Sequence, residues 1–214
     1  MTDSHAGSSD PHDYLRDDPH LGPLIDRNGR LTLDPAEDFF ERFVVSIVRQ
    51  QVSMHAAAAT RERLFDAVDV TPEGVLAADP ETLRDAGLSR QKTRYVRNVA
   101  EAFADGRLDR TRLSDVDDEA ALAELTSITG VGTWTAKMQL MFSLGRPDVF
   151  PVEDLGIRKG MHRLFDVDLT RPEMVERAEP WRPYRSYASL YLWGVDEGFE
   201  DTIAEVDVVD SGDE

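Results

Sequence analysis

Apolar residues recur at helical spacing along most of the chain, and no segment shows the sustained alternation of a half-buried strand. Cap residues followed by proline, and glycines that stop a pattern, mark the ends of these segments. The sequence therefore predicts an all-α fold with about ten helices. The expected helices span about 36–52 and 56–68, open at Pro72 and at Pro80, and then span 90–105, 118–125, 133–144, 154–165, 171–178 and 184–194.

The formal net charge of −18 is concentrated at the two ends of the chain. Residues 1–20 carry five acids and one base, and residues 196–214 carry nine acids and no base. The stretch between them has a net charge of only −5 and holds 23 of the 24 basic residues. Because strongly acidic segments with few apolar residues cannot form a core, residues 1–20 and 201–214 are predicted to be largely disordered tails.

Lysine is scarce among the basic residues, with three lysines against 21 arginines. An acidic, lysine-poor composition is typical of salt-loving organisms that keep concentrated salt in the cytoplasm, and we expect the chain to come from a halophilic archaeon. Charges are screened over about 3 Å in molar salt. A net charge of −18 is therefore no argument against DNA as a partner, provided that hydrogen bonds and shape carry the affinity.

The composition also excludes several kinds of site. The chain has no cysteine, so it forms no disulfide, no zinc–thiolate site and no thiolate-bound iron–sulfur cluster. No apolar run approaches the roughly 20 residues that span a bilayer, and the first residues lack the basic and apolar stretches of a secretory signal. We expect a cytoplasmic protein with no membrane partner.

Two glycines, Gly130 and Gly132, stand one residue apart between two predicted helices. Glycine lets the backbone turn sharply there while the N–H groups stay accessible. The second helix begins at the same point, and a helix N-terminus attracts anions through its dipole and its free N–H groups. The segment therefore predicts a site for a DNA phosphate. The alternative is an ordinary corner between two helices.

Asp154 follows a proline-bearing loop, 22 residues after Gly132, and lies near the start of a predicted helix. An aspartate in this place is a common helix cap. The helix dipole also favours the ionised carboxylate, which is the state that stabilises a cationic sugar. The residues alone leave both interpretations open, a structural cap and a catalytic carboxylate.

The hairpin, the spacing and the aspartate together resemble the helix-hairpin-helix DNA glycosylases, and in particular the branch of 3-methyladenine DNA glycosylase II, which removes alkylated purines. The resemblance covers about residues 18–199. Three further segments match the family in the expected order, namely residues 47–53, 87–95 and 181–188.

The resemblance implies two lobes with the active-site cleft between them, one from about residues 55–150 and the other from residues 21–54 with 151–200. The substrate would be double-stranded DNA containing a damaged base, bound by a monomer at the nucleoid. Asp154 would be the catalytic residue. The residues implied to bind DNA are Gln50, Gln51, Gly130, Val131, Gly132, Thr133 and Arg158, and those implied to line the base pocket are Phe40, Trp134, Tyr184 and Trp193.

Two further properties follow from the resemblance. Family members bind a monovalent cation, K⁺ or Na⁺, through hairpin carbonyls that correspond to Thr126, Ile128 and Val131, and no other cofactor is expected. Members that also cut the strand carry a lysine two residues beyond the last hairpin glycine, where this chain has Trp134. Lys137 lies one turn further on and would face differently. A glycosylase without lyase activity is therefore expected.

Three functions remain open at this point. The first is a glycosylase for alkylated purines such as 3-methyladenine and 7-methylguanine. The second is a glycosylase of the same fold for oxidised or deaminated purines. The third is a DNA-binding protein with a helix-hairpin-helix motif and no catalytic activity, and a catalytic role for Asp154 distinguishes the first two from it.

Overall fold

The computed structural model describes residues 10–195 of the chain. Within these residues the fold is helical, with thirteen α-helices, one 3₁₀ helix and no strand. Within the described residues the chain forms two compact units, which are residues 10–33 with 147–195 (unit 1) and residues 34–146 (unit 2). The prediction of an all-α fold with two lobes is confirmed, while the cleft stays a prediction. None of the described helices is long and apolar enough to cross a membrane.

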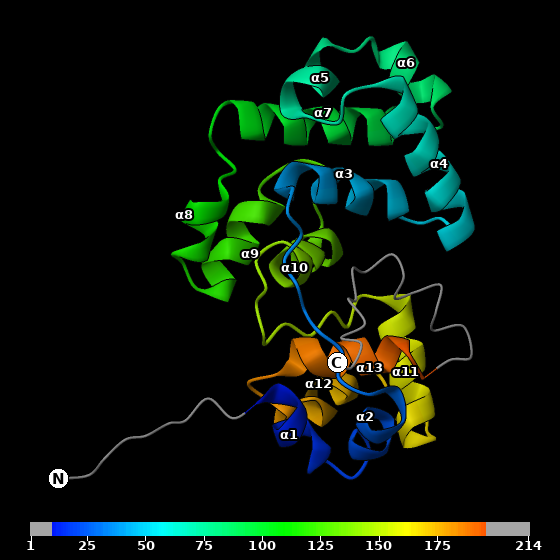
Figure 1. The fold of residues 1–214 in the computed structure, drawn as a ribbon, viewed down its shortest axis with the longest axis vertical. Coiled ribbons are helices and arrows are strands. Elements are labelled where there is room, and N and C mark those ends of the chain that lie inside the picture. Colours follow the sequence, from blue (N-terminus) through cyan, green and yellow to red (C-terminus); the bar gives the residue numbers. More distant parts are fainter. Residues whose placement is uncertain (1–9, 196–214) are drawn as a thin grey trace, which may run out of the picture. The chain divides into compact units, whose positions relative to one another are not determined.

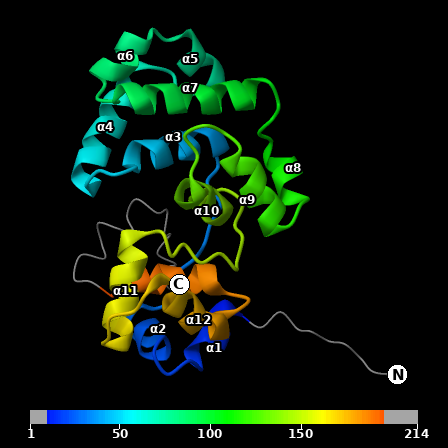
Figure 2. The ribbon, with the colours of Figure 1, turned by 180° about the vertical axis from the view of Figure 1, so that it is seen from behind.

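Unit 2 is organised around α3, which lies between α7 and α10 (Figure 1 and Figure 2). The rings of Phe39 and Phe43 on α3 pack against Phe103 of α7, with centroids 5.0 and 6.1 Å away. Its helices are α3 (Phe39–Arg49), α4 (Met54–Ala67), α5 (Pro72–Ala77), α6 (Pro80–Asp85), α7 (Arg90–Ala104), α8 (Arg110–Ser114), α9 (Asp118–Thr126) and α10 (Thr133–Phe142).

Unit 1 is organised around α13, which contacts α1, α2, α11 and the 3₁₀ helix η1. Trp181 is fully buried in this unit, and its indole N–H donates a hydrogen bond to Asp18 Oδ2 at 3.0 Å. The elements are α1 (Pro11–Arg16), α2 (Gly22–Asn28), α11 (Leu155–Phe165), α12 (Arg171–Arg177), η1 (Glu179–Trp181) and α13 (Arg185–Trp193).

The structure corrects the extent of the N-terminal tail. Residues 1–9 and the expected C-terminal tail lie outside the described residues, but Pro11–Arg16 is helical. Asp10 caps this helix by accepting a hydrogen bond from the backbone N–H of His12 at 2.9 Å, and Leu15 is buried. Acidic residues that the sequence assigns to a disordered tail thus stabilise the start of a helix, where negative charge is favourable.

The expected boundary between the lobes is also wrong. Unit 2 begins at Asp34 and ends at Arg146, so α3 belongs with the hairpin and not with the second lobe. Its apolar face could have been buried by either lobe, because both are helical, and the structure buries it against α7 and α10. The ten expected helices all form within a few residues of their predicted ends, and the elements missed are the short ones, α1, α2, α8 and η1.

Tyr191 of α13 ties this helix to the segment that follows α2. Its hydroxyl donates a hydrogen bond to the carbonyl of Gly29 at 2.8 Å and accepts one from the N–H of Leu31 at 3.2 Å. Burial raises the pKa of Tyr191 from 10 to about 12. The folded chain therefore keeps this proton to a higher pH than the unfolded chain, and the resulting stabilisation is complete below about pH 10 and lost as the pH rises through about 12.

We expect the free energy of unfolding to fall between about pH 9 and 12 by roughly 2–3 kcal/mol more in the wild type than in Tyr191→Phe. Urea unfolding at a fixed molar KCl concentration measures both curves. Parallel curves would contradict the assignment, because the remaining tyrosines titrate alike in the two proteins.

Candidate active site

Asp154 is held by donors from two helices. It is the N-cap of α11, and its Oδ1 accepts a hydrogen bond from the backbone N–H of Ile157 at 3.0 Å. The same oxygen accepts a hydrogen bond from the indole N–H of Trp193 at 2.9 Å, from a residue 39 positions further along the chain. The residue is a helix cap, but the indole gives the carboxylate a second, fixed contact that a simple cap does not need.

The close approach of Trp193 depends on a glycine. A Cβ on Gly156 would lie 2.7 Å from Cδ1 of Trp193 and 3.0 Å from Oδ1 of Asp154. A second glycine, Gly160, brings α11 against α13, because a Cβ there would lie 2.3 Å from the carbonyl oxygen of Leu192. The two glycines let the first two turns of α11 pack directly on the C-terminal half of α13.

This arrangement suits one kind of chemistry. A carboxylate that accepts two N–H hydrogen bonds at a helix N-terminus is held in one orientation by donors from two helices. Such a fixed negative charge stabilises a positively charged sugar or orients an attacking water. The contact between Asp154 and Trp193 was missed in the sequence, although both residues had been singled out.

The two glycines of the hairpin between α9 and α10 serve different needs. Gly130 has a φ of +107°, and a Cβ there would lie 2.3 Å from the ring of Tyr95. Gly132 is the N-cap of α10 with a φ of −84°, and a Cβ there would meet nothing within 4 Å. The helix α10 thus begins without a side-chain cap and beside open space, as an anion site requires.

The residues that flank Gly132 differ in what they offer a ligand. Thr133 is exposed and is the first residue of α10. Val131 is buried, and its N–H donates a hydrogen bond to the carbonyl of Ile128 at 2.9 Å. The N–H of Val131 therefore closes the hairpin turn, and its expected role as a DNA contact stays a prediction.

Two side-chain amides fix the hairpin carbonyls. Asn98 of α7 donates a hydrogen bond to the carbonyl of Thr129 at 2.9 Å. Gln50, the C-cap of α3, donates to the carbonyl of Gly130 at 3.1 Å and to the hydroxyl of Thr135 at 2.9 Å. The amide of Gln50 thus supports the hairpin from within unit 2, and its expected contact with DNA stays a prediction.

Gln51 is presented differently from Gln50. It is exposed and has a left-handed φ of +57°, which is unusual for a residue with a side chain. The preceding end of α3 is fixed by Lys92, whose Nζ donates to the carbonyl of Val48 at 2.6 Å and whose pKa is lowered by burial. Ser53 caps the start of α4 on the other side. An exposed side chain on a loop anchored at both ends suits insertion into DNA.

The aromatic residues expected in one pocket lie in different places. Trp193 contacts Asp154, whereas Tyr184 is the N-cap of α13 at the opposite end of the same helix. Nine residues of helix separate the two by about 13 Å. Tyr184 packs edge-on against Tyr14 of α1, with ring centroids 5.4 Å apart. Tyr184 and Trp193 thus lie at opposite ends of α13, and the prediction that Tyr184 lines the base pocket stays a prediction.

The other two aromatic candidates belong to unit 2. Phe40 is 4% exposed and packs edge-on against Phe103, with centroids 5.2 Å apart, so it is a core residue of this unit. Trp134 is half-buried in the first turn of α10, directly after Thr133. The prediction for Phe40 is corrected, and that for Trp134 stays a prediction.

Arg158 also serves the fold of its own unit. Its Nη1 donates hydrogen bonds to the carbonyls of Glu153 and, at 3.4 Å, of Val152. The guanidinium thus folds back onto the loop that leads to Asp154. The expected role of Arg158 as a DNA contact stays a prediction.

Backbone carbonyls are the candidates for a cation site. Thr126 is the last residue of α9, where the helix dipole favours positive charge, and the carbonyl of Ile128 lies in the turn that follows. Oxygen donors of this kind suit a hard cation. Among the described residues, no group of three His, Cys, Asp or Glu side chains is placed to hold a metal ion.

Comparison with known proteins identifies the family. Residues 44–183 match the description HhH-GPD superfamily base excision DNA repair protein, and this match includes the hairpin and Asp154. The chain belongs to the HhH-GPD superfamily. The superfamily member described here shares 33% identity with DNA-3-methyladenine glycosylase 1 of Schizosaccharomyces pombe over 163 residues, which is 72% of this chain and 71% of that protein.

Two solved structures resemble this superfamily member over most of its length. The 3-methyladenine DNA glycosylase of S. pombe in complex with abasic DNA has a TM-score of 0.79 at 29% identity, and the match covers 86% of this chain and 94% of that chain. The DNA-3-methyladenine glycosidase of Bacillus halodurans has a TM-score of 0.75 at 34% identity, with coverages of 90% and 92%. The chain spans only 55–63% of the length of three matched relatives from B. subtilis and Escherichia coli.

Proposed function

We propose that this HhH-GPD protein is a monofunctional DNA glycosylase that flips alkylated purines out of double-stranded DNA and releases them by hydrolysis in base excision repair. The observation that carries the proposal is the carboxylate of Asp154, held by the N–H groups of Ile157 and Trp193. Relatives named DNA-3-methyladenine glycosylase support the choice of alkylated purines.

In the proposed reaction, the bond between sugar C1′ and the purine nitrogen breaks and the base leaves with the bonding electrons. A purine alkylated at N3 or N7 is positively charged, so it leaves as a neutral molecule and needs no strong general acid. Asp154 stabilises the positive charge that develops on the sugar and orients the water that adds to C1′. The proton of this water passes to solvent or to the carboxylate.

DNA binding is assigned to separate parts of the two units. The N–H groups at the start of α10 bind a backbone phosphate, and the carbonyls of Thr126, Ile128 and Val131 hold a K⁺ or Na⁺ ion beside it. Gln51 fills the gap that the flipped base leaves, since flipping costs a few kcal/mol that damaged pairs reduce. The ring of Trp193, which contacts Asp154 within unit 1, attracts the cationic base by roughly 0.5–2 kcal/mol.

The absence of lyase activity is part of the proposal. Trp134 stands two residues after Gly132, where lyase chemistry would need a lysine as nucleophile. The enzyme would act as a monomer on DNA at the cytoplasmic nucleoid and would require no cofactor beyond the monovalent cation. The acidic composition supports a working environment of molar salt, with a halophilic archaeon as the source.

Base release in molar KCl tests the proposed function. Duplexes that carry 3-methyladenine, 7-methylguanine, hypoxanthine or 8-oxoguanine are incubated with the enzyme, and both free base and strand breaks are measured. We expect release of the two methylated purines, with abasic sites left uncut until alkali is added. Release of only hypoxanthine or 8-oxoguanine would contradict the substrate class, and strand cleavage without alkali would contradict the monofunctional assignment.

A further inference from the structure

The loop that leads to Asp154 is attached to α13 at both of its ends. At the far end, Trp193 in the last turn of α13 donates to Asp154. At the near end, the N–H of Ser186 donates to the carbonyl of Pro147 at 2.9 Å, and the N–H of Val149 donates to Oγ of Ser186 at 2.8 Å. The loop and the helix thus form a closed frame within unit 1.

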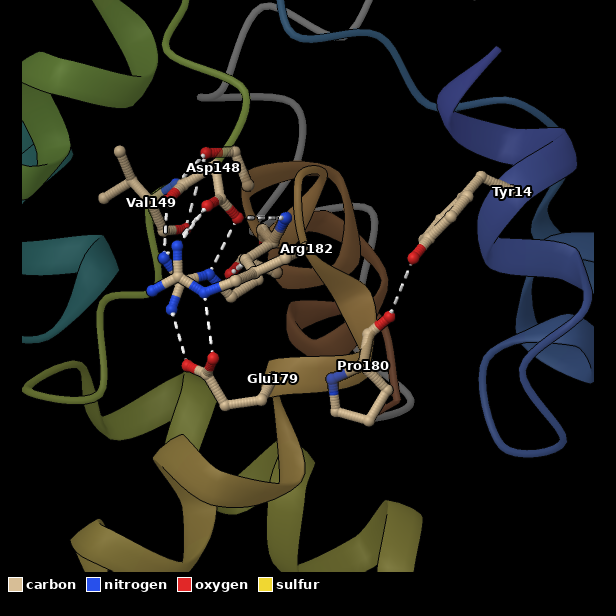
Figure 3. A network of polar contacts seen from close by, with 9 residues as sticks. Tyr14, Asp148, Val149, Glu179, Pro180 and Arg182 are labelled. Carbon is tan, nitrogen blue, oxygen red and sulfur yellow. Dashed lines mark hydrogen bonds and ion pairs between the residues drawn. The ribbon is translucent and has the colours of Figure 1, made fainter. Parts of the chain in front are cut away.

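The near end of this frame contains a shielded ion pair (Figure 3). Arg185, the first residue of α13, donates from Nε to Oδ1 of Asp148 at 2.7 Å and from Nη2 to Oδ2 at 3.1 Å. Its Nη2 also donates to the Asp148 carbonyl at 3.0 Å. The two side chains are 11% and 18% exposed. A bidentate contact of this kind fixes the orientation of both side chains, which the ammonium group of a lysine cannot do.

A second arginine contacts the same carboxylate from the solvent side. Arg182 donates from Nη1 to Oδ2 of Asp148 at 2.8 Å and from Nε to Glu179 at 2.9 Å (Figure 3). The side chains of Arg182 and Glu179 are 51% and 49% exposed, so this outer pair contributes little in salt. Arg182 also precedes α13 and is not carried by it.

The lengths of α13 and of the loop show why the contact between Asp148 and Arg185 is needed to place Asp154. From Arg185 to Trp193 the helix rises by eight residue steps, which is about 12 Å. The six residues from Asp148 to Asp154 can reach about 20 Å when extended. The loop is therefore longer than the distance that it has to span, and its length alone does not define where Asp154 lies. Fixing Asp148 to the start of α13 removes much of this freedom.

We propose that Asp148 and Arg185 are positioning residues that set the placement of Asp154 relative to Trp193. The pair holds the first turn of α13 against the loop, and the rigid helix carries this alignment to the indole that orients the catalytic carboxylate. Because both side chains are largely shielded, the pair keeps this role in molar salt. The inference rests on the proposed function for its kinetic consequence but not for its structural one.

The test compares Arg185→Lys with Arg182→Lys in the full chain. Both variants keep the charge and change one guanidinium next to Asp148, but only Arg185 lies on α13. In Arg185→Lys we expect the Trp193 indole N–H to exchange with solvent at least about tenfold faster in NMR spectra, because the bond to Asp154 opens more often. Single-turnover release of 7-methylguanine is expected to slow by about 10- to 100-fold, with the Kd for an abasic duplex within about twofold.

Arg182→Lys is expected to stay within about twofold of the wild type in all three measurements. Should Arg185→Lys fail to fold, Asp148→Asn, which keeps the shape of the acceptor, replaces it with the same expectations. Equal losses in the two lysine variants would overturn the inference, since they would indicate a general effect on stability. Slower release with unchanged exchange of the Trp193 N–H would also overturn it, and so would faster exchange with unchanged release.

The exchange measurement separates this inference from the proposed function. A wild type that releases none of the four lesion bases would refute the proposed function. The change in Trp193 exchange between Arg185→Lys and Arg182→Lys would still decide whether the ion pair positions the indole on Asp154. Trp134, which belongs to unit 2, provides the internal reference signal.

Discussion

Replacement of Asp154 by asparagine is expected to slow the release of 7-methylguanine by about 10²- to 10³-fold while leaving the fold and DNA binding intact. Asparagine is as good an N-cap as aspartate, and its amide oxygen can accept the same hydrogen bonds from Ile157 and Trp193. What the variant removes is the negative charge that the proposed mechanism places beside the developing sugar cation. Single-turnover release in molar KCl measures this loss without interference from product dissociation.

A second helix cap provides the control for this variant. Asp117 caps α9 through a 2.8 Å hydrogen bond from the N–H of Ala120, but no role in the chemistry is assigned to it. Asp117→Asn should therefore match Asp154→Asn in the free energy of unfolding, within about 1 kcal/mol, and match the wild type in rate. Full activity of Asp154→Asn would refute the catalytic assignment and favour a helix-hairpin-helix protein that only binds DNA.

The parts of the fold that were predictable depend on local rules. Caps such as Thr71 and Asp79 and stops such as Gly106 act within one turn of the chain, so together with the apolar spacing they predict the ten helices. The hairpin followed in the same way from Gly130 and Gly132. The helix α1 was missed because net charge was averaged over 20 residues, which hides a cap and a buried face only six residues long.

The errors at the site concern contacts between residues far apart in the sequence. Gln50 lies 80 positions from Gly130, and Trp193 lies 39 positions from Asp154. No periodicity specifies which donor finds which acceptor over such distances. The sequence therefore assigns a polar residue beside a functional motif to the ligand alone, whereas Gln50 and Arg158 also hold the backbone of the motif in place. Residues that contact a ligand and residues that hold those contacts in place are of the same types, so composition cannot distinguish them.

Gly130 and Gly132 are expected to respond to alanine in opposite ways, although they belong to the same turn. Gly130→Ala places a Cβ at a φ of +107° and 2.3 Å from the ring of Tyr95. The left-handed backbone alone costs about 1–2 kcal/mol, and the displaced ring adds to it. We expect the free energy of unfolding to fall by about 2–4 kcal/mol in urea titrations. DNA affinity should fall as well, because Tyr95 and the hairpin shift together.

Gly132→Ala should leave stability nearly unchanged, because its φ of −84° suits any residue and the new methyl group meets no atom within 4 Å. The same methyl group would project from the start of α10, where the proposed phosphate approaches the N–H groups. We expect the Kd for an abasic duplex, measured at one fixed KCl concentration, to rise about tenfold or more, which corresponds to ~1.4 kcal/mol. Wild-type affinity in a folded Gly132→Ala would show that the phosphate binds elsewhere, and Gly130 would then be required only for the turn itself.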